Sequence, residues 1–118
     1  TKKSQGILIK FSGQLTFNAL PNSQNSNDVC FLALDQISDP QNFGQIIRTS
    51  ECAGVDGIIF PKYNASSVSQ TVLDVSQGAF VSIPLYEITN LSQELIELKK
   101  DGFFLKDRFI NSYYFIKI

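Results

Sequence analysis

The order of apolar and helical segments predicts an α/β fold: a mostly parallel sheet with helices on both faces. Residues 29–34 are continuously apolar, which is typical of a strand buried on both faces. Residues 57–60 form a second such segment, and a stretch with helical periodicity separates the two. Strands that alternate with helices imply crossover connections between parallel strands. We therefore expect residues 1–118 to form a single domain.

The helix between these two strands has clear start and stop signals. Asp39 can cap its free N–H groups, and Pro40 suits the first helical position because it has no N–H to lose. Gly54 suits the left-handed turn that ends a helix. Residues at three- and four-residue spacing form the stripe that should face the core: Phe43, Ile46, Ile47 and Ser50.

The remaining elements follow along the chain. Asn90 should cap one helix, with Gln93 as its capping-box partner and Gly102 beyond its end. Pro84 marks its strand as an edge strand or a strand start. We expect a helix over 64–77, strands over 7–11, 82–86, 103–105 and within 110–118, and a flexible loop over the Ser-, Asn- and Gln-rich residues 12–28.

Composition excludes several classes of chemistry. The chain has no histidine, which removes Ser-His and Cys-His nucleophile pairs and most zinc sites. Cys30 and Cys52 lack metal-ligand spacing and are expected to be buried thiols in a reducing compartment, so neither a disulfide nor a metal is expected. No stretch is apolar enough to span a bilayer, so no membrane partner is expected. The net charge is -1, so RNA binding would need a local basic patch.

The loop after the first buried strand is the best candidate site on physical grounds. Ligands of parallel α/β sheets bind beyond the carboxyl ends of the strands, and a helix N-terminus there favours an anion such as phosphate. Residues 35–42 occupy this position. Asp39 and Asn42 also have ordinary explanations as helix-start residues, and Arg48 falls on the outer face of the helix. A carboxylate pair of Asp35 and Asp39 gives only weak support to a hydrolase.

One motif surrounds this loop and continues past the helix. Its residues are Leu34-Asp35, Asp39-Pro40-Gln41-Asn42-Phe43-Gly44, Arg48-Thr49-Ser50 and Gly54-Val55-Asp56. This motif closely resembles the first signature motif of the SpoU/TrmH class of SPOUT RNA methyltransferases. The likeness extends through Gly78-Ala79 and Pro84-Leu85, and covers most of residues 4–86.

The resemblance implies a Rossmann-like part of a SPOUT (α/β-knot) domain and a methyltransferase of a ribose 2′-hydroxyl in tRNA or rRNA. S-adenosylmethionine would be the methyl donor. The resemblance also implies a homodimer. The expected location is the cytoplasm, with a mitochondrion or another organelle as the alternative. Arg48 and Asn42 would be catalytic, and Asp39, Asn42 and Arg48 would contact RNA. Because an arginine side chain stays protonated, we assign Arg48 an electrostatic role.

The sequence departs from the family pattern at several points. Asp74 and Val81 stand where relatives often carry lysine and glutamate. The later segments that tie the knot and bind the cofactor are missing from residues 103–118, so we expect a domain truncated at its C-terminus with unknown cofactor-binding residues. The aromatic tail is expected to be a packed strand, with stacking on single-stranded RNA as the alternative.

Two other interpretations remain open. The chain could be a non-catalytic RNA-binding or subunit-interaction module that keeps the fold without the cofactor site. It could also be an unrelated flavodoxin-like enzyme that binds phosphate at residues 35–42, although this gives no reason for the motif ending in Arg48.

Overall fold

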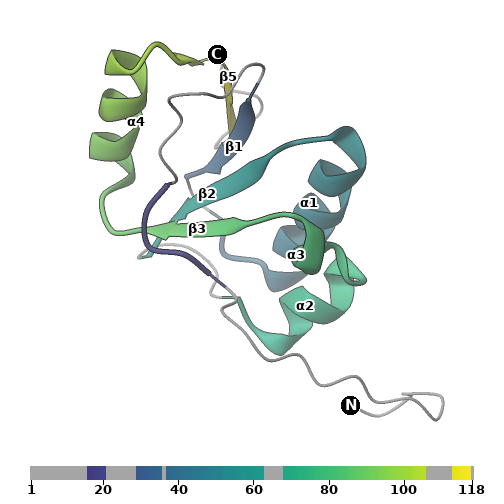
Figure 1. Ribbon diagram of the computed structural model, residues 1–118. Coiled ribbons are helices and arrows are strands. Elements are labelled where there is room, and N and C mark those ends of the chain that lie inside the picture. Colours follow the sequence, from purple (N-terminus) through teal and green to yellow (C-terminus); the bar gives the residue numbers. More distant parts are fainter. Residues whose placement is uncertain (1–15, 21–28, 36, 63–67, 106–112, 118) are drawn as a thin grey trace, which may run out of the picture.

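The core of the molecule is a five-stranded sheet in the order β3-β2-β1-β5-β4 (Figure 1). The computed structural model describes residues 16–20, 29–35, 37–62, 68–105 and 113–117. Within these residues the strands are β1 (Cys30–Leu34), β2 (Gly57–Pro61), β3 (Leu85–Ile88), β4 (Phe104–Leu105) and β5 (Tyr113–Lys117).

The predicted parallel sheet is confirmed for its first three strands. β1 pairs with β2, and β2 with β3, in parallel register. β5 instead runs antiparallel to β1, with Leu32 opposite Phe115, and β4 runs antiparallel to β5. A parallel connection needs a crossover of about a dozen residues or more. Only residues 106–112 separate β4 from β5, so an antiparallel return is the short route.

Helices cover both faces of the sheet, as predicted (Figure 1). Side chains of a strand alternate between faces. Leu32 and Leu34 of β1 join one buried cluster, and Phe31 and Ala33 join the other. The first cluster lies against α1 (Pro40–Ala53), α2 (Gln70–Ser76) and α3 (Ala79–Ser82), and the second lies against α4 (Leu91–Lys100).

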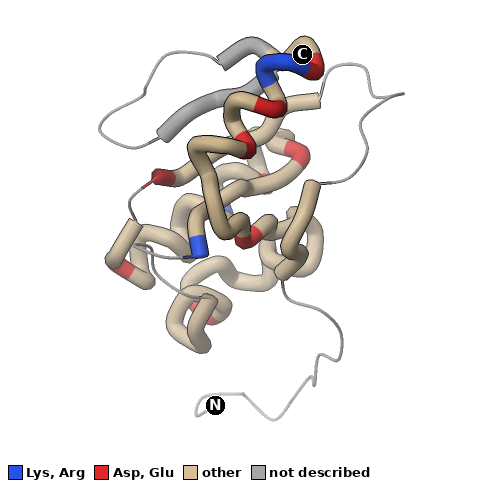
Figure 2. Tube along the Cα trace, turned by 90° about the vertical axis from the view of Figure 1, so that its left-hand side faces the viewer, with Lys and Arg blue, Asp and Glu red and all other residues tan. Residues whose placement is uncertain are grey.

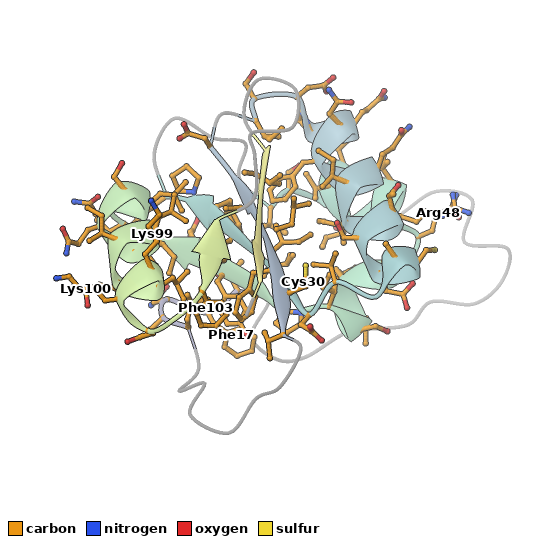
Figure 3. All side chains as sticks on the ribbon, turned by 90° about the horizontal axis from the view of Figure 1, so that it is seen from above. Phe17, Cys30, Arg48, Lys99, Lys100 and Phe103 are labelled. Carbon is orange, nitrogen blue, oxygen red and sulfur yellow. The ribbon has the colours of Figure 1, made fainter. Side chains whose placement is uncertain are left out.

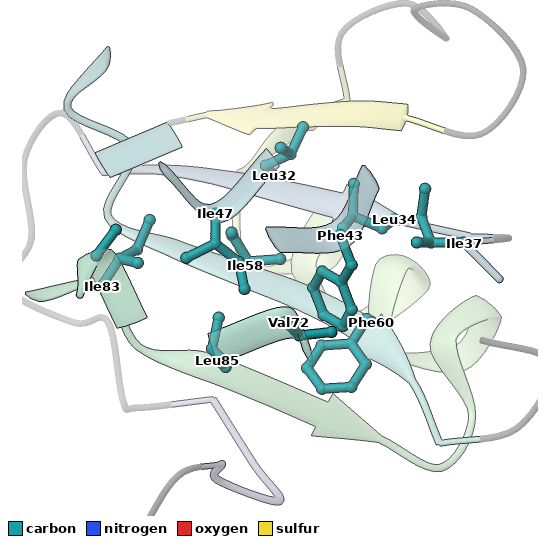
Figure 4. Close-up of a cluster of buried hydrophobic side chains, with 11 residues drawn as sticks. Leu32, Leu34, Ile37, Phe43, Ile47, Ile58, Phe60, Val72, Ile83 and Leu85 are labelled. Atoms are coloured by element: carbon teal, nitrogen blue, oxygen red, sulfur yellow. The ribbon is translucent and has the colours of Figure 1, made fainter. Parts of the chain in front are cut away.

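The first cluster is built around an aromatic pair (Figure 4). Phe43 of α1 and Phe60 of β2 meet edge to face, with ring centroids 5.1 Å apart. Their exposed fractions are 0 % and 1 %. Burial of rings of this size stabilises a core by a few kcal/mol each, which fixes α1 against the sheet.

The second cluster requires a glycine at the start of β2. Phe31 and Tyr86 pack edge to face, with centroids 6.0 Å apart. A Cβ atom at Gly57 would lie 2.7 Å from the Tyr86 ring and 3.1 Å from the Phe31 ring. Because glycine has no side chain, the rings of Phe31 and Tyr86 can occupy the space beside Gly57.

The second predicted helix is shorter than expected. Residues 64–67 lie outside the described residues, and α2 begins only at Gln70. Ser69 is its N-cap, and the Ser69 hydroxyl accepts a hydrogen bond from the N–H of Val72 at 3.4 Å. Val68 and Ser69 are therefore not helical. Gln77 and Gly78 are both left-handed, which separates α2 from the short helix α3.

Two further predictions shift in detail. The strand expected over 82–86 runs from Leu85 to Ile88, because Ser82 ends α3 and Pro84, which lacks an N–H, precedes the ladder. β3 ends the sheet order, in agreement with the edge position that Pro84 predicted. Asn90 caps α4 by accepting from the N–H of Gln93, as expected. The Gln93 side chain, however, bonds Glu97 and does not complete a capping box.

Part of the predicted loop over 12–28 pairs with the sheet. The N–H of Phe17 donates to the carbonyl of Leu85 at 2.9 Å, and the Phe17 carbonyl accepts from the N–H of Glu87 at 2.8 Å. This bridge covers the outer side of β3 at Tyr86. Residues 12–15 and 21–28, and the strand expected over 7–11, lie outside the described residues.

Candidate functional site

The motif begins where β1 ends, at the carboxyl edge of the parallel strands. Asp39 lies between Leu34, the last residue of β1, and α1. Its carboxylate accepts a hydrogen bond from the N–H of Gln41 at 3.0 Å, and its carbonyl accepts from the N–H of Phe43 at 3.0 Å. The predicted cap is confirmed, so folding alone accounts for Asp39. Its contact with RNA stays a prediction.

Gly44 has a structural role in the same motif. A Cβ atom at this position would lie 2.6 Å from Val75 Cβ and 2.8 Å from the carbonyl oxygen of Val72. Real Cβ contacts are longer than this, so any side chain at Gly44 would push α2 away from α1. The glycine therefore allows α1 and α2 to approach closely.

The Gly54-Val55-Asp56 segment is a structural turn. Gly54 has φ 81°, a left-handed conformation that ends α1. The N–H of Val55 donates to the carbonyl of Ser50 at 3.0 Å. The Asp56 carboxylate then accepts from the N–H of Cys30 at 2.8 Å, while its own N–H donates to the Cys30 carbonyl at 2.8 Å. Asp56 thus ties the start of β1 to the start of β2.

Replacing Asp56 with alanine is expected to lower the free energy of unfolding by about 1 kcal/mol, the usual value of a lost hydrogen bond. Asp56→Asn, which keeps one acceptor oxygen, should lose less. Urea denaturation of both variants measures the difference. Glu51→Ala, an exposed change on α1, is the control. Equal stability of Asp56→Ala and the unchanged chain would contradict the role of this carboxylate.

Among the predicted site residues, Asn42 and Arg48 have no folding role in the described part of the chain. Both are exposed on α1, and Figure 3 shows Arg48 pointing away from the sheet. Within the described part of the chain, neither side chain makes a hydrogen bond or an ion pair. An unpaired guanidinium on a surface is free to bind a phosphate or carboxylate group from another molecule.

Arg48 lies at a surface hollow between α1 and α2 with a volume of about 450 Å³. One side of the hollow is formed by α1 residues that share a face of the helix, at three-, four- and seven-residue spacing from Gln45. The end of α2 forms the other side. The lining residues are Gln45, Arg48, Thr49, Cys52, Val75 and Gln77. Sequence reasoning found only Arg48 among them, although the spacing from Gln45 to Cys52 is a readable signal. The prediction that both cysteines are buried is wrong, because Cys52 is exposed on the outer face of α1 and Cys30 is only partly buried.

Of the three predicted site residues, only Arg48 is among the residues that line the described hollow. Asn42 precedes Arg48 by about 9 Å along the helix axis and by about 120° around it. Neither Asn42 nor Asp39 lines the hollow. The start of α1, with Asp39 and Asn42, and the side chain of Arg48 are therefore two separate places at which α1 would contact a ligand.

The two departures from the family pattern also have defined positions. The Asp74 carboxylate accepts a hydrogen bond from the Gln70 side chain at 2.8 Å, one turn earlier on α2. Val81 is 63 % exposed on α3. Its side chain brings neither the charge nor the hydrogen-bonding groups of a glutamate to the surface of α3.

Along the described part of the trace, basic residues are scattered apart from one adjacent pair (Figure 2). Lys99 and Lys100 lie at the end of α4, across the sheet from Arg48 (Figure 3), and Lys100 pairs with Glu97 at 3.8 Å. Among the described residues, no group of three His, Cys, Asp or Glu could hold a metal ion. None of the described helices is long and apolar enough to cross a bilayer. Lys106 and Arg108 lie outside the described residues.

Comparison with known proteins supports the resemblance in the motif. The model of the SpoU rRNA Methylase family matches residues 30–110. A TrmH-family tRNA/rRNA methyltransferase of Staphylococcus aureus (strain COL) is 43 % identical over 74 residues, which cover 63 % of this chain and 30 % of the relative. One from Staphylococcus haemolyticus is 42 % identical over 72 residues, 61 % of this chain and 29 % of the relative. The chain thus spans about 30 % of the length of these relatives.

Two solved structures share the fold. An AdoMet-bound rRNA methyltransferase from Sinorhizobium meliloti has a TM-score of 0.54 and 29 % identity, over 62 % of this chain and 27 % of that one. The SpoU methyltransferase AviRb from Streptomyces viridochromogenes, solved with AdoMet, has a TM-score of 0.61 and 21 % identity, over 73 % of this chain and 35 % of that one. The second likeness concerns the fold alone. With its motif, its fold and the match over residues 30–110, this chain belongs to the SpoU rRNA methylase family.

Proposed function

We propose that the chain forms the RNA-facing part of an S-adenosylmethionine-dependent methyltransferase that modifies a ribose 2′-hydroxyl in tRNA or rRNA. The observation that carries this proposal is the exposed side chain of Arg48, which makes no hydrogen bond or ion pair within the described residues. Its motif neighbours Asp39, Gly44 and Asp56 all have folding roles, whereas Arg48 has none. The names of the relatives and the AdoMet bound to the two solved structures support AdoMet-dependent methylation of tRNA or rRNA, and the ribose position rests on the resemblance of the motif.

Arg48 would act by electrostatics. A guanidinium holds a phosphate through two parallel N–H donors, which would orient the target nucleotide. Its charge would also stabilise the negative charge that develops on the 2′-oxygen as the hydroxyl loses its proton. Asn42 and Asp39, at the start of α1, would contact the RNA farther along the same helix.

The AdoMet bound to the two solved structures supports S-adenosylmethionine as the cofactor. No buried side-chain polar atom of the described residues lacks a hydrogen-bond partner that this ligand would supply. We therefore assign no cofactor contact to these residues and propose that others provide it. A homodimer, with subunits sharing the site, is part of the same proposal.

A non-catalytic RNA-binding or subunit-interaction module is the second candidate. It is favoured by Val81, which is exposed where family members often carry a glutamate. This candidate predicts RNA affinity that falls as salt rises and that does not respond to S-adenosylmethionine.

Two measurements separate these candidates. The first is calorimetric titration of the 118-residue chain with S-adenosylmethionine and with S-adenosylhomocysteine. The second is transfer of a labelled methyl group to tRNA and rRNA, followed by alkaline hydrolysis, which a 2′-O-methyl group blocks at the modified nucleotide. Cofactor binding with an alkali-resistant product supports the enzyme. RNA binding by a folded chain without either result supports the binding module, and label on a base contradicts ribose specificity.

A further inference from the structure

We propose that the hollow between α1 and α2 receives one unpaired ribonucleotide, and that Gln77 determines which base it accepts. This inference rests on the proposed function, because it takes RNA as the ligand. It adds a specificity-determining residue that lies outside the signature motif and opposite Arg48 in the hollow.

The lining of the hollow suits one nucleotide held at the surface. The hollow has a volume of about 450 Å³ and is open to solvent, so a nucleotide would rest in it without being enclosed. Arg48 is the one charged side chain among the described residues that line it, so its charge favours an anion such as phosphate. Gln45, Thr49 and Gln77 add neutral hydrogen-bonding groups, and Val75 adds an apolar surface for a ring.

The backbone at Gln77 is the second observation. Gln77 ends α2 with φ 54°, the one positive φ among the described residues other than glycine. Glycine adopts this conformation without cost, and asparagine tolerates it better than glutamine does. A glutamine here accepts backbone strain and keeps a carboxamide at the rim of the hollow. Strain retained beside a binding site is the pattern expected of a functional residue.

The chemistry of the two walls assigns the parts of the ligand. The guanidinium of Arg48 would take the phosphate, because it offers parallel N–H donors. The carboxamide of Gln77 both donates and accepts hydrogen bonds, so it can read the edge of a base. Proteins read RNA sequence mainly from unpaired bases, whose edges are free. A single-stranded segment therefore fits this site better than a duplex.

The test is fluorescence anisotropy of the 118-residue chain with three labelled single-stranded decamers, of A, of C and of U. We expect the chain to prefer one decamer. Gln77→Gly should reduce affinity for that decamer by about fivefold, the value of one hydrogen bond, and leave the other two nearly unchanged. The same variant should melt at an equal or higher temperature, because glycine relieves the strain. A loss of binding with no loss of stability could not arise from misfolding.

Arg48→Ala should weaken binding to all three decamers by a similar factor and reduce the salt dependence by about one counterion. Gln93→Ala, at an exposed glutamine on α4 across the sheet, is the control and should change neither affinity nor base preference. Gln77→Asn, which keeps a carboxamide and suits the backbone, should retain part of the preference.

The outcomes distinguish this inference from the proposed function. If Arg48→Ala weakens all three decamers but Gln77→Gly weakens none, or weakens all of them equally, the role of Gln77 is wrong and RNA binding at Arg48 stands. If the folded chain binds no decamer, or if Arg48→Ala has no effect, both the inference and the RNA-contact role of Arg48 are wrong.

Discussion

Replacing Arg48 with alanine is expected to lower methyl transfer to RNA by about 100-fold or more, the usual cost of removing one electrostatic group from a transition state. The free energy of unfolding should change by less than about 0.5 kcal/mol, because the side chain is exposed and makes no hydrogen bond or ion pair within the described residues. Single-turnover transfer of labelled methyl groups measures the first quantity, and urea denaturation measures the second.

Two further variants make this test specific to the guanidinium. Arg48→Lys keeps the positive charge but loses the planar pair of donors, so its activity should fall between those of alanine and arginine. Lys99→Ala removes an exposed positive charge from α4, across the sheet, and should leave transfer unchanged. Full activity of Arg48→Ala would show that this residue has no part in the reaction.

Of the single substitutions that we propose, Gly44→Ala should lower the free energy of unfolding the most. The new Cβ atom would lie 2.6 Å from Val75 Cβ, and overpacking of this kind costs about 1–3 kcal/mol. Alanine favours a helix over glycine by about 1 kcal/mol, which offsets part of the loss. We expect the free energy of unfolding to fall by about 1–2 kcal/mol, measured by urea denaturation. Thr49→Ala, an exposed change on the same helix, should have little effect.

A double mutant tests whether α2 is the obstacle. Val75→Ala removes the Cγ atoms, one of which would lie 2.9 Å from the new Cβ, so α2 could shift more easily. The combined loss in Gly44→Ala/Val75→Ala should therefore be smaller than the sum of the two single losses. Strict additivity would mean that the close approach of α1 and α2 does not limit this position.

Where one strong local signal decided an element, the sequence predicted it well. Asp39 and Pro40 start α1, and Gly54 ends it, at the expected residues, because caps act within one turn of the helix. The predicted helix includes Val68 and Ser69, because the apolar spacing extends to Val68. In the structure Ser69 is the N-cap, so α2 begins only at Gln70. β3 moved along the chain for a similar reason, since Pro84 and the end of α3 act against a strand at Ser82.

For the candidate site too, local sequence signals predicted some features, and only the tertiary structure showed the others. The sequence by itself determined the family motif, the position of Arg48 on the outer face of α1 and the cap at Asp39, because helical periodicity and capping depend on neighbouring residues. Only the tertiary structure decided that β5 lies antiparallel beside β1, that Gly44 admits α2, and that Gln77 lies across a hollow from Arg48. These are contacts between distant segments, and they depend on how whole elements pack, which no local pattern records.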